Sequence, residues 1–159
     1  MVTPYEVAAA VVDPELRVVT IGELGILRSV EVKDDTAVAT ITPTYSGCPA
    51  MDLIRNEITA ALRRAGWQRV EVVTQLSPPW TTDWITESGR AKLAAAGIAP
   101  PGPAPTVALG MPRREPPAPA CPHCGAADTV EVSRFGATPC MSLWRCDRCR
   151  EPFEHVKAF

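Results

Sequence analysis

The chain has 159 residues, of which 46% are hydrophobic, and a formal net charge of −2 at pH 7. This length allows one domain of about 100 residues together with a small module stabilised by other means. The charge gives no indication of nucleic acid or an anionic membrane surface as a partner. The longest early apolar run, Val7–Val12, is too short for a membrane span or a signal core. We therefore expect a cytoplasmic protein.

The first residues predict a short helix. Thr3-Pro4-Tyr5-Glu6 is a capping box with proline at the first helical position, and the apolar run Val7–Val12 continues it. Asp13-Pro14-Glu15 should end the helix, because proline disfavours helical backbone at the preceding residue. From these residues alone, the simplest interpretation of Asp13 and Glu15 is two solvated carboxylates at a helix stop.

A hairpin is predicted next. Thr20–Gly25 has the composition of a loop, and Ile26–Lys33 and Thr36–Thr42 alternate apolar and polar residues as strands do. Asp34-Asp35 supplies a two-residue turn between them.

A second helix is predicted over Pro49–Ala65, stopped by Gly66, and a third strand over Val70–Leu76. The apolar stripe of that helix is predicted to comprise Leu53, Ile54, Ile58, Ala61, Leu62 and Ala65. These elements predict an α/β fold, with helices packed on a small, open, three-stranded mixed sheet.

The remaining chain divides by composition. Thr82–Ala96 reads as another amphipathic segment that ends at Gly97. Residues 98–119 contain eight prolines and predict a semi-rigid linker. We therefore expect a domain over residues 1–97, a linker over 98–119 and a small module over 120–159.

The small module carries a metal-binding pattern. Two C-x2-C pairs, Cys121 with Cys124 and Cys146 with Cys149, provide four thiolates for a closed tetrahedral shell. Such a site is structural, and metal binding would supply folding energy that the sparse apolar content does not. Zinc is the default metal, although iron or a cluster also suits four thiolates.

Other groups in the module have less definite roles. Cys140 is a buried small hydrophobe, a ligand or a reactive thiol, and His123 and His155 are expected at the surface or in support of the ligands. Five basic and five acidic side chains in residues 120–159 do not favour nucleic acid. Docking to a protein suits this composition better.

The loop Thr42–Met51 contains Cys48, the single cysteine of the first domain. Cys48 precedes Pro49 at the expected start of a helix, where the helix dipole should favour thiolate and lower the pKa of the thiol. A metal or cluster contact, a nucleophile and a plain helix-start residue all remain open. Neither histidine lies in this domain, which disfavours a cysteine hydrolase, and we assign no catalytic residue.

Several short motifs carry a resemblance to known families. Asp13-Pro14-Glu15, Thr42-Pro43-Thr44, Gly47-Cys48-Pro49 and Pro78-Pro79-Trp80 resemble the motifs of SufT-like metal–sulfur cluster assembly domains, over about residues 3–97. Together with Phe135–Cys140 and Glu151-Pro152-Phe153 in the module, they make the whole chain similar to the PaaD family, accessory subunits of phenylacetyl-CoA epoxidase. Met141 and His155 depart from that family's pattern, which leaves the role of Cys140 open.

The resemblance implies a maturation factor without catalytic activity of its own. Such a protein would assemble or insert an iron–sulfur or iron centre of the epoxidase during aerobic phenylacetate degradation. Cys48 would be the functional thiol, with Asp13 and Glu15 as its partners. The implied partners are the oxygenase or reductase subunits, and a homodimer would give a transient cluster a second thiolate. A structural subunit that transfers no metal is the alternative.

Overall fold

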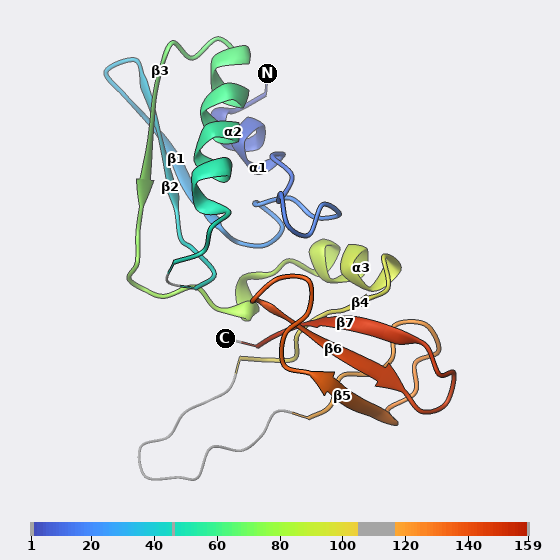
Figure 1. Cartoon of the computed structure of the whole chain (residues 1–159). Helices are drawn as coiled ribbons and strands as arrows, with labels where there is room; N and C mark the ends of the chain where they lie inside the picture. The colour runs from blue at the N-terminus through green and yellow to red at the C-terminus, as the bar shows by residue number, and fades with distance from the viewer. Residues whose placement is uncertain (1, 46, 105–116, 159) are drawn as a thin grey trace. The chain divides into compact units, whose positions relative to one another are not determined.

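The computed structural model describes residues 2–45, 47–104 and 117–158. The chain forms two compact units (Figure 1). One contains the residues up to Trp80 together with Trp84–Gly89, and the other contains Thr81–Asp83 and the residues from Arg90 onwards.

The first unit begins with α1, which covers Pro4–Ala9. Its predicted capping box is confirmed: the Glu6 N–H donates to Thr3 Oγ1 at 3.2 Å, and the Thr3 N–H donates to the Glu6 carboxylate at 2.7 Å. The helix ends at Ala9, earlier than predicted. Val12 instead forms an isolated β-bridge with Thr20, since β-branched residues suit extended backbone.

Three strands form the sheet of this unit. β1 (Leu27–Lys33) and β2 (Thr36–Ile41) make the predicted antiparallel hairpin, and β3 (Arg69–Thr74) lies parallel to β2. The turn residues Asp34 and Asp35 have φ values of 47° and 61°. The order β1-β2-β3 makes this the mixed sheet that the sequence predicts.

The crossover between β2 and β3 is α2 (Met51–Arg64), which packs on the sheet (Figure 1). It starts two residues later than predicted and ends before Gly66, whose φ of 105° suits the expected helix stop. Its buried residues are Met51, Ile54, Ile58 and Leu62.

Leu53 does not belong to this buried stripe. Its side chain is 56% exposed, so the prediction that placed it in the core was wrong. At about 100° per residue, Leu53 lies roughly 140° from the centre of the stripe formed by Met51, Ile54 and Ile58, close to the opposite face of the helix. The large apolar side chain is therefore left at the surface of α2.

After β3 the chain stays in the first unit as far as Trp80. The Trp80 side chain is buried and its Nε1–H donates to the Leu24 carbonyl at 2.9 Å. A 3-10 helix (Thr82–Trp84) and α3 (Glu87–Ala95) follow, and the Arg28 guanidinium lies 3.5 Å from the centre of the Trp84 ring. The segment predicted as one amphipathic element therefore forms two short helices.

A four-stranded sheet forms the second unit, in the order β4-β7-β6-β5. Its strands are β4 (Ile98–Ala99), β5 (Thr129–Ser133), β6 (Met141–Cys146) and β7 (Pro152–Val156). The core contains Ala99, Cys121, Ala126, Cys146 and Phe153. This core is small, which agrees with the expectation that the module needs a metal to fold.

Two residues assigned to the linker by composition, Ile98 and Ala99, pair with β7 in this sheet. Residues 105–116, the middle of the predicted linker, lie outside the described residues. In the described part of the chain, no helix is both long enough and apolar enough to cross a bilayer.

Candidate functional sites

Two tight turns hold the four cysteines of the C-terminal module. In the first, the Gly125 N–H donates to the Cys121 carbonyl at 2.8 Å, and in the second the Arg150 N–H donates to the Cys146 carbonyl at 3.0 Å. Gly125 and Arg150 both have positive φ, at 74° and 67°. The two C-x2-C pairs therefore form matching turns, and Cys146 also ends β6.

The four sulfur atoms fit one metal ion. All four lie within 4.8 Å of one another, with 3.7 Å between the Sγ atoms of Cys121 and Cys149 and 3.6 Å between those of Cys124 and Cys146. None of the described cysteines forms a disulfide. A tetrahedron with zinc–sulfur bonds of about 2.3 Å separates its sulfurs by roughly 3.8 Å. The donor set and its spacing therefore suit a closed four-thiolate site.

The backbone of the second turn favours thiolate. The Cys149 N–H points at Cys146 Sγ, 3.5 Å away, and this contact is the main cause that lowers the pKa of the Cys146 thiol to about 7. A thiol with a lowered pKa releases its proton to a metal more readily than an ordinary thiol does. The electrostatics at Cys146 thus agree with the sulfur geometry of the four-cysteine site.

Cys140 and His155 lie outside the group of four ligands, which among the described residues contains only cysteines. Cys140 is buried, and its Sγ lies 3.0 Å from the Thr138 hydroxyl. Burial lowers the pKa of His155 to about 4, so its imidazole is neutral at physiological pH. Its Nδ1 lies 3.4 Å from the Ser142 hydroxyl.

The loop after β2 carries Cys48 to the start of α2. The Cys48 N–H donates to the Tyr45 carbonyl and the Met51 N–H donates to the Cys48 carbonyl, both at 3.3 Å. The Cys48 side chain is half-buried. The thiol therefore lies in the loop between β2 and α2, before the first turn of α2, as the sequence predicts.

Asp13 is buried, with 5% of its surface exposed, so the interpretation of two solvated carboxylates was wrong for this residue. Its Oδ1 accepts the N–H groups of Glu15 at 3.0 Å and Leu16 at 2.8 Å, and its carbonyl accepts the Arg17 N–H at 2.9 Å. Asp13 thus organises the turn that follows α1. Burial raises the pKa of its carboxyl despite these hydrogen bonds.

Asp13, Glu15 and Cys48 come from two separate loops, and the charges of the two carboxylates act on the Cys48 thiol. Among the described residues, these three do not form a group whose ligand atoms are close enough to share one metal ion, as the four ribbon cysteines do. Burial is the main cause that raises the pKa of the Cys48 thiol, and the charges of Glu15 and Asp13 raise it further. Hydrogen bonds from the Ala50 N–H and the Thr44 hydroxyl lower the pKa but do not outweigh burial. The predicted lowering by the helix dipole was therefore wrong in direction.

This electrostatic environment disfavours an anion and favours a cation. A cation near the thiol would be attracted by the charges of the two carboxylates and would stabilise the thiolate.

Thr42 is the residue of this region whose environment the sequence did not reveal. Its side chain is 1% exposed, and among the described residues its Oγ1 has no hydrogen-bond partner. An unpaired buried hydroxyl costs about 1–3 kcal/mol. Its position next to the end of β2 was the available signal, since functional groups gather at the carboxyl ends of parallel strands.

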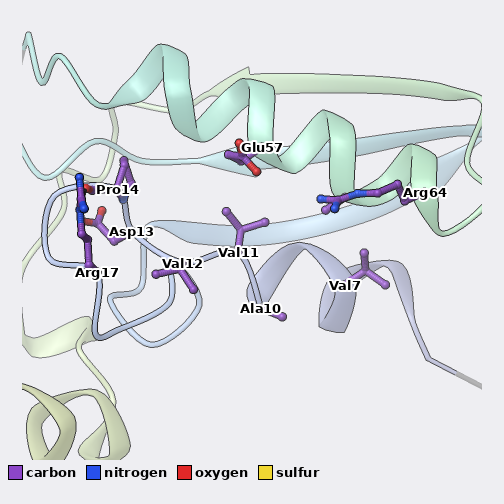
Figure 2. Close-up of a pocket in the computed structure, with 10 residues that line it drawn as sticks. Val7, Ala10, Val11, Val12, Asp13, Pro14, Arg17, Glu57 and Arg64 are labelled. Atoms are coloured by element: carbon purple, nitrogen blue, oxygen red, sulfur yellow. Dashed lines mark hydrogen bonds between the residues drawn. The ribbon is translucent and has the colours of Figure 1, made fainter.

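A groove of about 570 Å³ lies beside this region, between α1, the turn that follows it and α2 (Figure 2). Figure 2 shows Asp13 and Arg17 toward one end and Arg64 toward the other. The residues that line the groove are Val7, Ala10, Val11, Val12, Asp13, Pro14, Arg17, Glu57, Ala61 and Arg64.

Known protein families match both parts of the chain. Residues 6–74 match the family model described as iron-sulfur cluster assembly protein, and residues 106–157 match the PaaD zinc beta ribbon domain. The chain is 43% identical over 145 residues to a protein of Escherichia coli (strain K12) that is named as a putative subunit of 1,2-phenylacetyl-CoA epoxidase. That alignment covers 91% of this chain and 85% of the relative.

Two solved structures match part of this chain. A domain of unknown function, DUF59, from Bacillus anthracis is 30% identical with a TM-score of 0.52, covering 57% of this chain and 87% of that one. A protein from Mycobacterium tuberculosis described as associated with Fe-S complex assembly and repair is 34% identical with a TM-score of 0.37, covering 58% and 81%.

The fold and the sites define a two-part class of protein: an α/β domain of the iron–sulfur cluster assembly type, joined to a four-cysteine zinc ribbon. Within this class, the similarity to the Escherichia coli protein extends along 91% of the chain. The chain belongs to the PaaD family of phenylacetyl-CoA epoxidase subunits.

Proposed function

We propose that the protein is a non-catalytic maturation factor that assembles or inserts an iron–sulfur or iron centre of the phenylacetyl-CoA epoxidase complex. The observation that carries this proposal is the grouping of Cys48 with the carboxylates of Asp13 and Glu15. A thiol that can bind iron, with two negative charges that attract a cation nearby, suits transient iron binding.

Iron, alone or in a cluster, is the cargo in this proposal. The carboxylates of Asp13 and Glu15 attract the cation, and its charge offsets their effect on the Cys48 thiol, which then releases its proton. A single thiolate is a weak site, and weak binding suits a cargo that must be released. A homodimer would add a second Cys48 for a cluster.

The ribbon has a different task. Cys121, Cys124, Cys146 and Cys149 would hold zinc as a resident structural ion, since four thiolates leave no open coordination position. The folded ribbon then provides a docking module. The name of the Escherichia coli relative supports the oxygenase or reductase subunits of the epoxidase as the partners.

The decisive test compares the wild-type protein with Cys48→Ala in cells that produce the epoxidase. We expect the variant to fold and keep zinc, while the oxygenase or reductase purified from those cells lacks iron or sulfide. Fully metallated, active epoxidase from cells with only the Cys48→Ala protein would refute the maturation role.

A structural subunit of the epoxidase complex is the second candidate. The raised pKa of Cys48 favours it, because a protonated thiol is a poor metal ligand. This candidate predicts stoichiometric co-purification with the epoxidase and no change in its metal content in Cys48→Ala. The same experiment therefore separates the two functions.

A further inference from the structure

The groove between α1 and α2 has an apolar floor and charged ends. Val7, Val11 and Ala61 belong to its lining, and Val12 at its margin is 51% exposed. Leu53 lies one helical turn before Glu57 on α2, so its exposed side chain extends this wall toward the start of the helix. The α2 side from Leu53 to Arg64 is about 16 Å long.

Arg17 and Arg64 lie at opposite ends of the groove (Figure 2). The Nε–H of Arg17 donates to the Pro14 carbonyl at 3.4 Å, and that of Arg64 donates to the Ala60 carbonyl at 3.2 Å. No carboxylate of the described residues forms an ion pair with either guanidinium. Both cations are therefore positioned by the backbone and available to an anionic partner.

Arg17 is also held in an unusual backbone conformation. Its φ is 58°, a left-handed value that few residues other than glycine adopt. The hydrogen bond from its N–H to the Asp13 carbonyl fixes the turn that presents it. The cation at this end of the groove is thus part of the turn that Asp13 organises.

These features select one kind of occupant. The walls are made of helix side chains and not of a free strand edge, so an added strand would find no backbone ladder to join. Two cations at opposite ends suit a ligand that spans the groove better than one compact anion does. A helix packs its apolar side chains between those of two neighbouring helices, over the length available here.

We propose that this groove binds an amphipathic helix of a partner protein, with an apolar stripe toward Val11 and Ala61 and acidic residues that meet Arg17 and Arg64. Glu57 of α2 lies in the groove between Arg17 and Arg64 and would face a basic residue of the partner helix. The end of the groove at Asp13 would place this helix beside the residues that surround Cys48.

The naming of the partner as a subunit of the epoxidase rests on the proposed function, whereas the chemistry of the groove does not. The test is therefore a binding measurement, with the purified oxygenase and reductase subunits as probes. The test variant is the double charge reversal Arg17→Glu/Arg64→Glu. The matched control is Arg63→Glu/Arg69→Glu, which changes the net charge equally at exposed positions outside the groove.

We expect the groove variant to bind at least about tenfold more weakly than the wild type, and the control to stay within about twofold. Circular dichroism and zinc content show that both variants are folded. Equal weakening in the two variants, or no wild-type binding to either of the two probes, would overturn the proposal.

A second measurement identifies the occupant. A photo-reactive benzoylphenylalanine in place of Val12 should cross-link to a segment of the probe that is helical and carries acidic residues. Cross-links only to a second copy of this chain, or to a basic segment, would overturn the proposed partner chemistry. If Cys48→Ala leaves the epoxidase metallated while the groove variant loses binding, the maturation role fails and the docking groove stands.

Discussion

The two cysteine sites of this protein differ in almost every property that controls metal binding. The ribbon gathers four sulfurs from two matching turns, and a backbone N–H lowers the pKa of Cys146. The N-terminal domain offers one half-buried thiol, Cys48, whose pKa is raised by burial and by two carboxylates. The first arrangement suits an ion that stays. The second suits a transiently bound cation, whose positive charge offsets the burial and the carboxylate charges that disfavour the Cys48 thiolate.

Substitution of a ribbon cysteine should have the largest effect. Cys146→Ser removes one of four ligands from a fully buried position, and structural zinc contributes on the order of 10 kcal/mol to the folding of small modules. We expect loss of zinc and loss of the β5–β7 sheet, measured by metal analysis and near-ultraviolet circular dichroism. Cys140→Ser is the control, because Cys140 lies outside the ligand group. Retention of zinc by Cys146→Ser would contradict the four-thiolate assignment.

Substitution of Cys48 should remove bound iron but leave the fold and the zinc site intact. Cys48→Ser keeps a polar group of similar size, so we expect the free energy of unfolding to change by less than about 1 kcal/mol. The protein loaded anaerobically with iron should lose that iron in the variant while its zinc is unchanged, as measured by metal analysis and absorption spectra. Equal iron content in the wild type and in Cys48→Ser would show that Cys48 does not bind the iron, and the contrast with the zinc site would fail.

The sequence predicted the ribbon site better than the Cys48 site, for a physical reason. The spacing within each C-x2-C pair is local and fixes a turn directly, and four thiolates have few alternative uses. The hairpin and the α2 crossover were also predictable from alternation and period. By contrast, the approach of Asp13 to Cys48 depends on how the turn after α1 packs beside α2, which no local pattern encodes.

The same limit explains the wrong direction of the Cys48 pKa. The helix dipole can be inferred from Pro49 and the helix that follows, but burial and the charges of Asp13 and Glu15 come from tertiary structure. Leu53 is a similar case. Its apolar character predicted burial, yet the orientation of α2 leaves it exposed beside a groove.

The carboxylates provide a finer test of the Cys48 site. Asp13→Asn and Glu15→Gln each remove a charge that raises the pKa of the Cys48 thiol, so that pKa should fall in both variants and fall further in the double variant. The pH dependence of alkylation by iodoacetamide measures it. Glu57→Gln, whose carboxylate is absent from the causes of the Cys48 shift, serves as the control. An unchanged pKa in the double variant would show that the carboxylates do not act on the thiol.

The smallest expected effect is on stability as a function of pH. Burial raises the pKa of Asp13 above its ordinary value of 3.8, so the folded protein binds this proton more tightly than the unfolded chain does. Stability from this group is therefore present below pH 3.8 and is lost as pH rises through the folded pKa. Asp13→Asn keeps an oxygen that can accept the N–H groups of Glu15 and Leu16, and it carries no charge. Its free energy of unfolding, measured by urea denaturation, should thus fall less than that of the wild type between about pH 4 and pH 7. Parallel curves for the two proteins would mean that the buried carboxylate is fully compensated by its two hydrogen bonds, and that its charge is available to a metal at no cost to the fold.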